Sequence, residues 1–183
     1  MHFSPYPLVF GRAPPGLGRR GRIYRRMDEY AEALAGFNRA LELDPAQTWA
    51  LAGRAAVYRA TGRYDDALAD FDRAIDLDPA DAVAIAGRAE THRLMNHHAE
   101  ALADFDRAID LDPSNAWAIG SRAQVYHAIG RYQEALAGFN RTIDADPTQA
   151  WALAGRGRVY KEIGEYDKAR EDFNRAIELD LIE

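Results

Sequence analysis

The sequence predicts an all-α solenoid made of five consecutive helix-turn-helix repeats. Prolines recur every 34 residues, and taking each as position 32 of a repeat divides the rest of the chain without insertion or deletion. Phenylalanine recurs at position 24 of every repeat and alanine at position 20. A period of about 20 to 50 residues is the signature of a stacked repeat protein. The repeats are 14–47, 48–81, 82–115, 116–149 and 150–183, and residues 1–13 match nothing else in the chain.

Each repeat carries two amphipathic stripes. In the first helix, positions 4, 8 and 11 are spaced i, i+4, i+7 and form one face. In the second helix, positions 20, 21, 24, 27 and 28 do the same, and in the second repeat they are Ala67, Leu68, Phe71, Ala74 and Ile75. Each helix therefore has one face to bury. One repeat cannot bury both of its own stripes, so the repeats must stack.

Turns are predicted between the helices. Position 15 holds residue types that tolerate the left-handed conformation in which helices often end. Its occupants are Asp28, Gly62, Asn96, Gly130 and Gly164. Asp-Pro then ends the second helix, because the residue before a proline is disfavoured in the helical region.

The second half of each repeat reads A-x3-F followed by P, which four repeats meet and the fifth meets except for the proline. Over residues 14–183 the chain thus resembles the tetratricopeptide repeat family. The resemblance implies a right-handed α-solenoid that acts as a protein-interaction scaffold or adaptor, and not as an enzyme. Two departures recur in every repeat. The family's tryptophan at position 4 is leucine or isoleucine, and its leucine at position 7 is Arg20, Arg54, Arg88, Arg122 or Arg156.

In the resembled family the first helices line a concave groove, and ligands touch positions 2, 5, 6, 9, 12 and 13. Here these positions are mainly basic, although the whole chain has a net charge of -6. They carry Arg19, Arg22, Arg25, Arg26, Arg59, Arg93, Arg158 and Lys161 against Glu90 and Glu162, and position 12 alone carries Arg25, Arg59, Arg93, His127 and Lys161. We expect this groove to bind an acidic peptide of another protein through charge-assisted hydrogen bonds. The alternative is an ordinary solvated face.

Tryptophans and small residues accompany the cations. Position 2 holds Trp49, Trp117 and Trp151, and positions 5 and 6 are almost all glycine, alanine or serine. One explanation is a floor that a partner's backbone approaches closely, with the tryptophans as anchors. The other is that each tryptophan packs on the preceding repeat and the glycines make room for it.

The arginine at position 7 borders the packing stripe. We expect its stem to be buried between repeats and its guanidinium to meet an acidic residue such as the aspartate before each proline. The family's carboxylate clamp for chaperone tails needs lysine and asparagine at set positions. Gly18, Arg22, Gly53, Val83 and Gly87 stand in the first such register, which disfavours that ligand class.

Several other functions are disfavoured. The chain has no cysteine, no catalytic constellation and no metal-ligand spacing, so no cofactor is expected. The G-x-G-x-x-G at 16–21 precedes a repeat helix rather than a βαβ unit, and His92, His97 and His98 lack the i, i+4 spacing of metal ligands. The acidic pI argues against nucleic acid, and no apolar run is long enough to span a membrane.

The sequence is thus typical of a soluble, cytoplasmic protein, and its excess of arginine over lysine is typical of a GC-rich bacterial genome. Self-assembly through the ends of the solenoid is the alternative function. In the last repeat Arg170 replaces the leucine of the packing stripe and Glu171 follows it, as expected of a terminal repeat whose outer face meets water. Leu181 and Ile182, in contrast, leave a surface for weak self-association.

Overall fold

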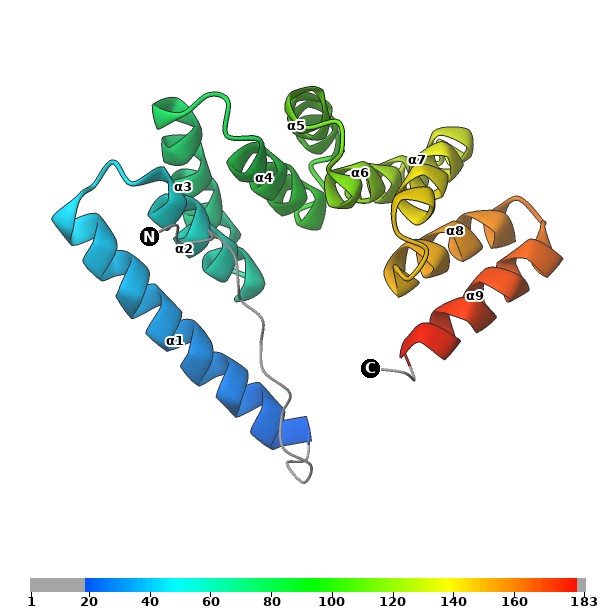
Figure 1. Ribbon diagram of the computed structural model, residues 1–183, viewed down its shortest axis with the longest axis horizontal. Helices are drawn as coiled ribbons and strands as arrows, with labels where there is room; N and C mark the ends of the chain where they lie inside the picture. Colours follow the sequence, from blue (N-terminus) through cyan, green and yellow to red (C-terminus); the bar gives the residue numbers. More distant parts are fainter. Residues whose placement is uncertain (1–18, 181–183) are drawn as a thin grey trace. The chain divides into compact units, whose positions relative to one another are not determined.

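The computed structural model describes residues 19–180, with side chains from residue 29 to 179, and every described element is an α-helix. The helices are α1 (Arg19–Leu43), α2 (Thr48–Ala60), α3 (Tyr64–Leu77), α4 (Ala82–Leu94), α5 (His98–Leu111), α6 (Ala116–Ala128), α7 (Tyr132–Ala145), α8 (Ala150–Glu162) and α9 (Tyr166–Asp180) (Figure 1). The chain divides into two compact units at the boundary between Pro79 and Ala80. Helices α1 to α3 belong to unit 1, and α4 to α9 belong to unit 2. The all-α repeat fold is therefore confirmed.

Four repeats form the predicted helix-turn-helix. Their position 15 residues, Gly62, Asn96, Gly130 and Gly164, adopt φ values of 78°, 61°, 77° and 83°. In each turn the next N–H bonds back to the carbonyl of position 11, as from Arg63 N to Tyr58 O at 2.8 Å and from Arg131 N to Tyr126 O at 2.8 Å. This is the hydrogen bond of a Schellman cap, and it requires the left-handed residue that precedes the donor.

The first repeat differs from the prediction. Where two helices were expected within 14–47, α1 runs without a break from Arg19 to Leu43, through Asp28. Position 15 is a glycine or asparagine in the other repeats. The left-handed conformation costs an aspartate more free energy than it costs a glycine, so the helix continues through Asp28. With no first helix folded back on it, the second half of α1 is less covered. Ala33 is half-buried, whereas the equivalent Ala67, Ala101 and Ala135 are fully buried.

The core of each unit follows the two stripes. The phenylalanines of position 24 in the interior repeats, Phe71, Phe105 and Phe139, are at most 2% exposed. In unit 2 the first helices touch each other, α4 with α6 and α6 with α8, while α5 and α7 make no direct contact. The first helices of unit 2 therefore form one continuous layer. We call its outward side, carried by α4, α6 and α8, the first-helix face.

Candidate functional site

The first-helix face of unit 2 brings together most of the expected peptide-binding residues. Trp117 and Trp151 lie in the first turns of α6 and α8, and Arg93, His127 and Lys161 lie in the last turns of α4, α6 and α8. Ten residues of helix span about 15 Å. The face thus has an aromatic edge and a basic edge separated by about 15 Å along the helices.

One of the expected cations is already paired. Arg93 binds Glu90, one turn earlier on α4, through two hydrogen bonds of 2.7 Å, from Nε to Oε2 and from Nη2 to Oε1. The carboxylate side of this pair is mostly buried, with an exposed fraction of 11%. Glu90 therefore compensates the charge of Arg93, and α4 offers little net positive charge to a ligand.

Arg158 and Lys161 on α8 are different. Both side chains are exposed, and the described part of the chain places neither in an ion pair. They are three residues apart, so they project from the same side of the helix. His127 on α6 lies between the two cationic helices in sequence order, with its ring 6.2 Å from that of Tyr132. The basic character of the face is thus concentrated on α8.

The remaining candidates lie elsewhere. Arg59, half-buried, and Trp49 are on α2 of unit 1. Arg22 and Arg25 lie in the first part of α1, outside the residues whose side chains the structure describes. The row of five cations predicted at position 12 is therefore divided between the two units, and each part has to be considered separately.

The small residues of positions 5 and 6 are explained by neighbouring rings. A Cβ atom on Gly53 would overlap the ring of Phe37, and one on Gly155 would overlap the ring of Phe139. A Cβ atom on Gly120 would overlap the indole of Trp151. Gly120 thus makes room for a tryptophan, as the packing explanation predicted, whereas Gly53 and Gly155 make room for phenylalanines. No partner backbone is needed to account for these three glycines.

Trp49 and Trp117 pack on the preceding repeat, but part of each indole stays exposed to solvent. Trp49 meets Phe37 edge-on with ring centroids 6.2 Å apart, and Trp117 meets Phe105 at 6.4 Å. Trp49 remains 58% exposed and Trp117 41% exposed. A large aromatic ring held on one side and open on the other can contact a ligand at little cost in side-chain entropy.

The described arginines of position 7 are structural, as predicted, but their predicted partner is wrong; Arg20 lies outside the residues whose side chains the structure describes. Arg54 binds Asp70 by Nε–Oδ2 and Nη2–Oδ1 hydrogen bonds of 2.6 and 2.7 Å. Arg88 binds Asp104 and Arg156 binds Asp172 in the same two-pronged way. Each partner is position 23 on the second helix of the same repeat, and not the aspartate before the proline. The hydrogen bonds that Arg54 and Arg156 donate to these buried carboxylates raise the pKa values of both arginines.

The aspartates before the prolines have another role. Asp112 Oδ1 accepts from Ser114 N at 3.0 Å, and Asp146 Oδ1 accepts from Thr148 N at 2.9 Å. These carboxylates close the loop between repeats, so they are not available to the arginines. The fourth repeat has Gly138 at position 23, and there Arg122 turns to Asp106 on α5. The recurrence of aspartate 16 residues after the arginine was the signal in the sequence that could have identified the correct partner.

No group of three or more metal-ligating side chains occurs among the described residues. In the same part of the chain, no helix is long and apolar enough to cross a membrane. The G-x-G-x-x-G sequence begins at residue 16, outside the described residues.

Comparison with known proteins identifies the repeat. Models of the tetratricopeptide repeat match residues 16–80, 84–115 and 115–181. A crystal structure of MamA is 23% identical, covers 90% of this chain and 96% of its own, and superposes with a TM-score of 0.71. The structure of YrrB, described as a tetratricopeptide protein with an unusual peptide-binding site, is 25% identical, covers 86% of this chain and 81% of its own, and gives 0.65.

A third solved structure is the first tetratricopeptide domain of Spaghetti (RPAP3) bound to the HSP90 peptide SRMEEVD. It is 22% identical, covers 64% of this chain and 94% of its own, and has a TM-score of 0.62. No curated protein sequence matches the chain.

Proposed function

Because the chain belongs to the tetratricopeptide repeat family, whose members are generally interaction modules without enzymatic activity, we propose that it binds an acidic peptide segment of another protein on the first-helix face of unit 2. The observation that carries this proposal is the pair of exposed cations on α8, Arg158 and Lys161, which have no ion-pair partner among the described residues. A carboxylate reaching either one gains a charge-assisted hydrogen bond without breaking an existing pair.

The rest of the face supports a ligand of mixed character. Trp117 offers an exposed aromatic surface about 15 Å from the basic edge, and a peptide crossing the face would reach both. Such a ligand would place acidic residues over α8 and an apolar residue against the tryptophan edge. Arg93 would contribute to steering rather than direct contact, because Glu90 holds it.

Two of the similar proteins bind peptides: YrrB has a peptide-binding site, and Spaghetti is bound to a peptide of HSP90. The HSP90 peptide is acidic, with two consecutive glutamates and an aspartate. This chain lacks the lysine and asparagine residues of the family's carboxylate clamp for chaperone tails. We therefore propose an acidic ligand, like the peptide bound to Spaghetti, held by a different set of contacts.

The proposal is tested by fluorescence anisotropy with labelled peptides. The probes are an acidic peptide containing a leucine or phenylalanine and a matched peptide with lysine in place of each acidic residue. We expect the double variant Arg158→Glu/Lys161→Glu to weaken binding of the acidic probe at least tenfold. Raising the salt from about 0.05 to about 0.3 M should also weaken it, because screening acts on exposed charges.

Arg170→Glu is the matched control. It changes the charge of a residue on α9 that is 75% exposed and paired only with Asp167 of the same helix among the described residues. It should leave the affinity within about twofold, since an exposed charge outside the binding face is screened. Equal losses in both variants would mean that only the overall charge matters, and an unchanged affinity in the double variant would contradict the proposal.

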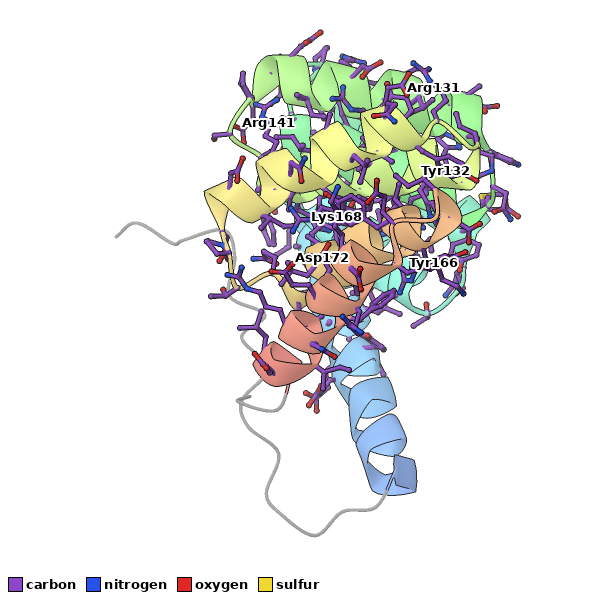
Figure 2. The ribbon with its side chains drawn as sticks, turned by 90° about the vertical axis from the view of Figure 1, so that its right-hand side faces the viewer. Arg131, Tyr132, Arg141, Tyr166, Lys168 and Asp172 are labelled. Atoms are coloured by element: carbon purple, nitrogen blue, oxygen red, sulfur yellow. The ribbon has the colours of Figure 1, made fainter. Side chains whose placement is uncertain are left out.

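A second candidate function is self-association through α9. Tyr166, at the start of α9 (Figure 2), is 69% exposed, and Ile177 is 57% exposed. The isoleucines equivalent to Ile177 in the interior repeats are at most 7% exposed: Ile75, Ile109 and Ile143. Light scattering over a range of protein concentrations tests it. A dimer that dissociates in Ile177→Glu supports the candidate, and a monomer at all concentrations excludes it.

A further inference from the structure

Three repeats share an arrangement of charge around one tyrosine, the residue of position 11. Arg54 and Arg63 lie 5.8 and 4.2 Å from the ring centre of Tyr58. Arg122 and Arg131 lie 5.8 and 4.6 Å from that of Tyr126, and Arg156 and Lys168 lie 5.8 and 5.5 Å from that of Tyr160. Each ring thus has two cations within cation–π distance.

The repeat at 82–115 replaces this arrangement with histidines. His92 occupies the position of the tyrosine, His97 follows the turn where two of the other repeats have arginine, and His98 replaces a second tyrosine at the start of α5. The rings of His92 and His97 are 5.8 Å apart. We call these three residues the histidine cluster. Its members are the side chains whose ordinary pKa lies closest to physiological pH.

Two nitrogens of the cluster are buried without partners. Nδ1 of His92 and Nδ1 of His98 have no hydrogen bond among the described residues. A neutral imidazole tolerates this, since Nδ1 is then an acceptor left unfilled. On protonation each Nδ1 becomes a charged donor, and a buried donor without an acceptor is costly.

Charges of both signs surround His92. Arg88 lies on α4 with His92, and it holds Asp104 of α5 by two hydrogen bonds. Asp104 and Glu100 on α5 attract a protonated His92, while Arg88 and His97 repel it. On α6, which packs against both α4 and α5, the arginine Arg122 is bound to Asp106 of α5. Burial is the largest influence and lowers the pKa of His92.

We propose that the histidine cluster makes the repeat at 82–115 a pH-sensitive element, in which mild acidification loosens the packing of α4 on α5 while the other repeats stay intact. The proposal stands apart from peptide binding. The direction follows from linkage. A histidine whose pKa is lower in the folded state binds more protons when unfolded, so stability is complete above its ordinary pKa of about 6.5 and declines as the pH falls below that value.

Hydrogen exchange measured by mass spectrometry at about pH 7.5 and about pH 5.5, corrected for the intrinsic exchange rate, tests this on the unmodified chain. We expect protection of α4 and α5 to fall at the lower pH and that of α7 and α8 to stay within about twofold. At about pH 5.5, one unit below the ordinary pKa, a histidine that stays neutral in the folded state lowers protection by at most about tenfold. Equal behaviour of the two helix pairs would overturn the proposal.

The double variant His92→Tyr/His98→Tyr provides the mutational arm, because repeats at 48–81 and 116–149 already carry tyrosine at both positions. It should remove the pH-dependent loss in α4 and α5. His127→Gln is the matched control, since it deletes another histidine of unit 2 outside the cluster, and it should keep the loss. A pH response that persists in the double variant, or that disappears in the control, would assign the effect to another group.

Discussion

The ion pair between Arg156 and Asp172 should contribute strongly to the stability of unit 2. The pair joins α8 to α9 through two hydrogen bonds, of 2.8 Å from Nε and 2.7 Å from Nη2, and Asp172 lies midway along α9 (Figure 2). The side chain of Asp172 is 6% exposed and that of Arg156 is 20% exposed. Solvent therefore screens the pair little, and net hydrogen bonds to charged groups contribute about 1.5–3 kcal/mol each.

A double-mutant cycle with Arg156→Met and Asp172→Ala measures the interaction by urea unfolding. We expect a coupling free energy of about 2–4 kcal/mol, because loss of either partner leaves the other charge largely buried. Each single variant should cost about 3 kcal/mol, and less in Asp172→Ala, where Arg156 keeps its hydrogen bond to Asn140.

The exposed pair between Arg131 and Glu134 is the control. Its side chains are 51% and 42% exposed, and pairs of this kind contribute about 0.3–0.5 kcal/mol. If the coupling free energy between Arg156 and Asp172 is no larger than that of this control pair, the structural role assigned to the position 7 arginines is refuted.

Three further substitutions test the packing and turns. Gly155→Ala should destabilise the fold by about 1–2 kcal/mol in thermal unfolding, because its methyl group would overlap the Phe139 ring; unchanged stability would show that the ring moves freely. Gly36→Ala, in α1 with no atom within 4 Å of the new methyl group, should instead stabilise by about 0.5–1 kcal/mol, and a loss would contradict the helix there. Gly130→Ala should cost about 1–2 kcal/mol, because its φ of 77° strains any residue with a Cβ, and a smaller cost than about 0.5 kcal/mol would argue against the left-handed turn.

The helices of the four complete repeats follow from the sequence because their pattern is local. A stripe at i, i+4, i+7 defines a buried face, and a glycine such as Gly62 defines a turn, without reference to any distant residue. The same pattern failed at Asp28. There the turn depends on a conformational preference that aspartate has only weakly, and the helix continues through it.

The charged partners could be predicted only in part. That Arg54 is structural follows from its place beside an apolar stripe, but several acidic residues lie within reach along the chain. Only the packing of α2 on α3 selects Asp70. The i, i+3 spacing of Glu90 and Arg93 already indicates that they can pair. Treated as two separate groove charges, they overstate the positive charge of α4, because the ion pair neutralises both.

The most direct test of the proposed binding face is a nuclear magnetic resonance titration of the isotope-labelled chain with the acidic peptide probe. We predict that shifts concentrate on α6 and α8, including the indole N–H groups of Trp117 and Trp151 and the residues around Arg158 and Lys161, with little change on α9. Shifts concentrated around Tyr166 and Ile177, or spread evenly over the acidic second helices, would contradict the account.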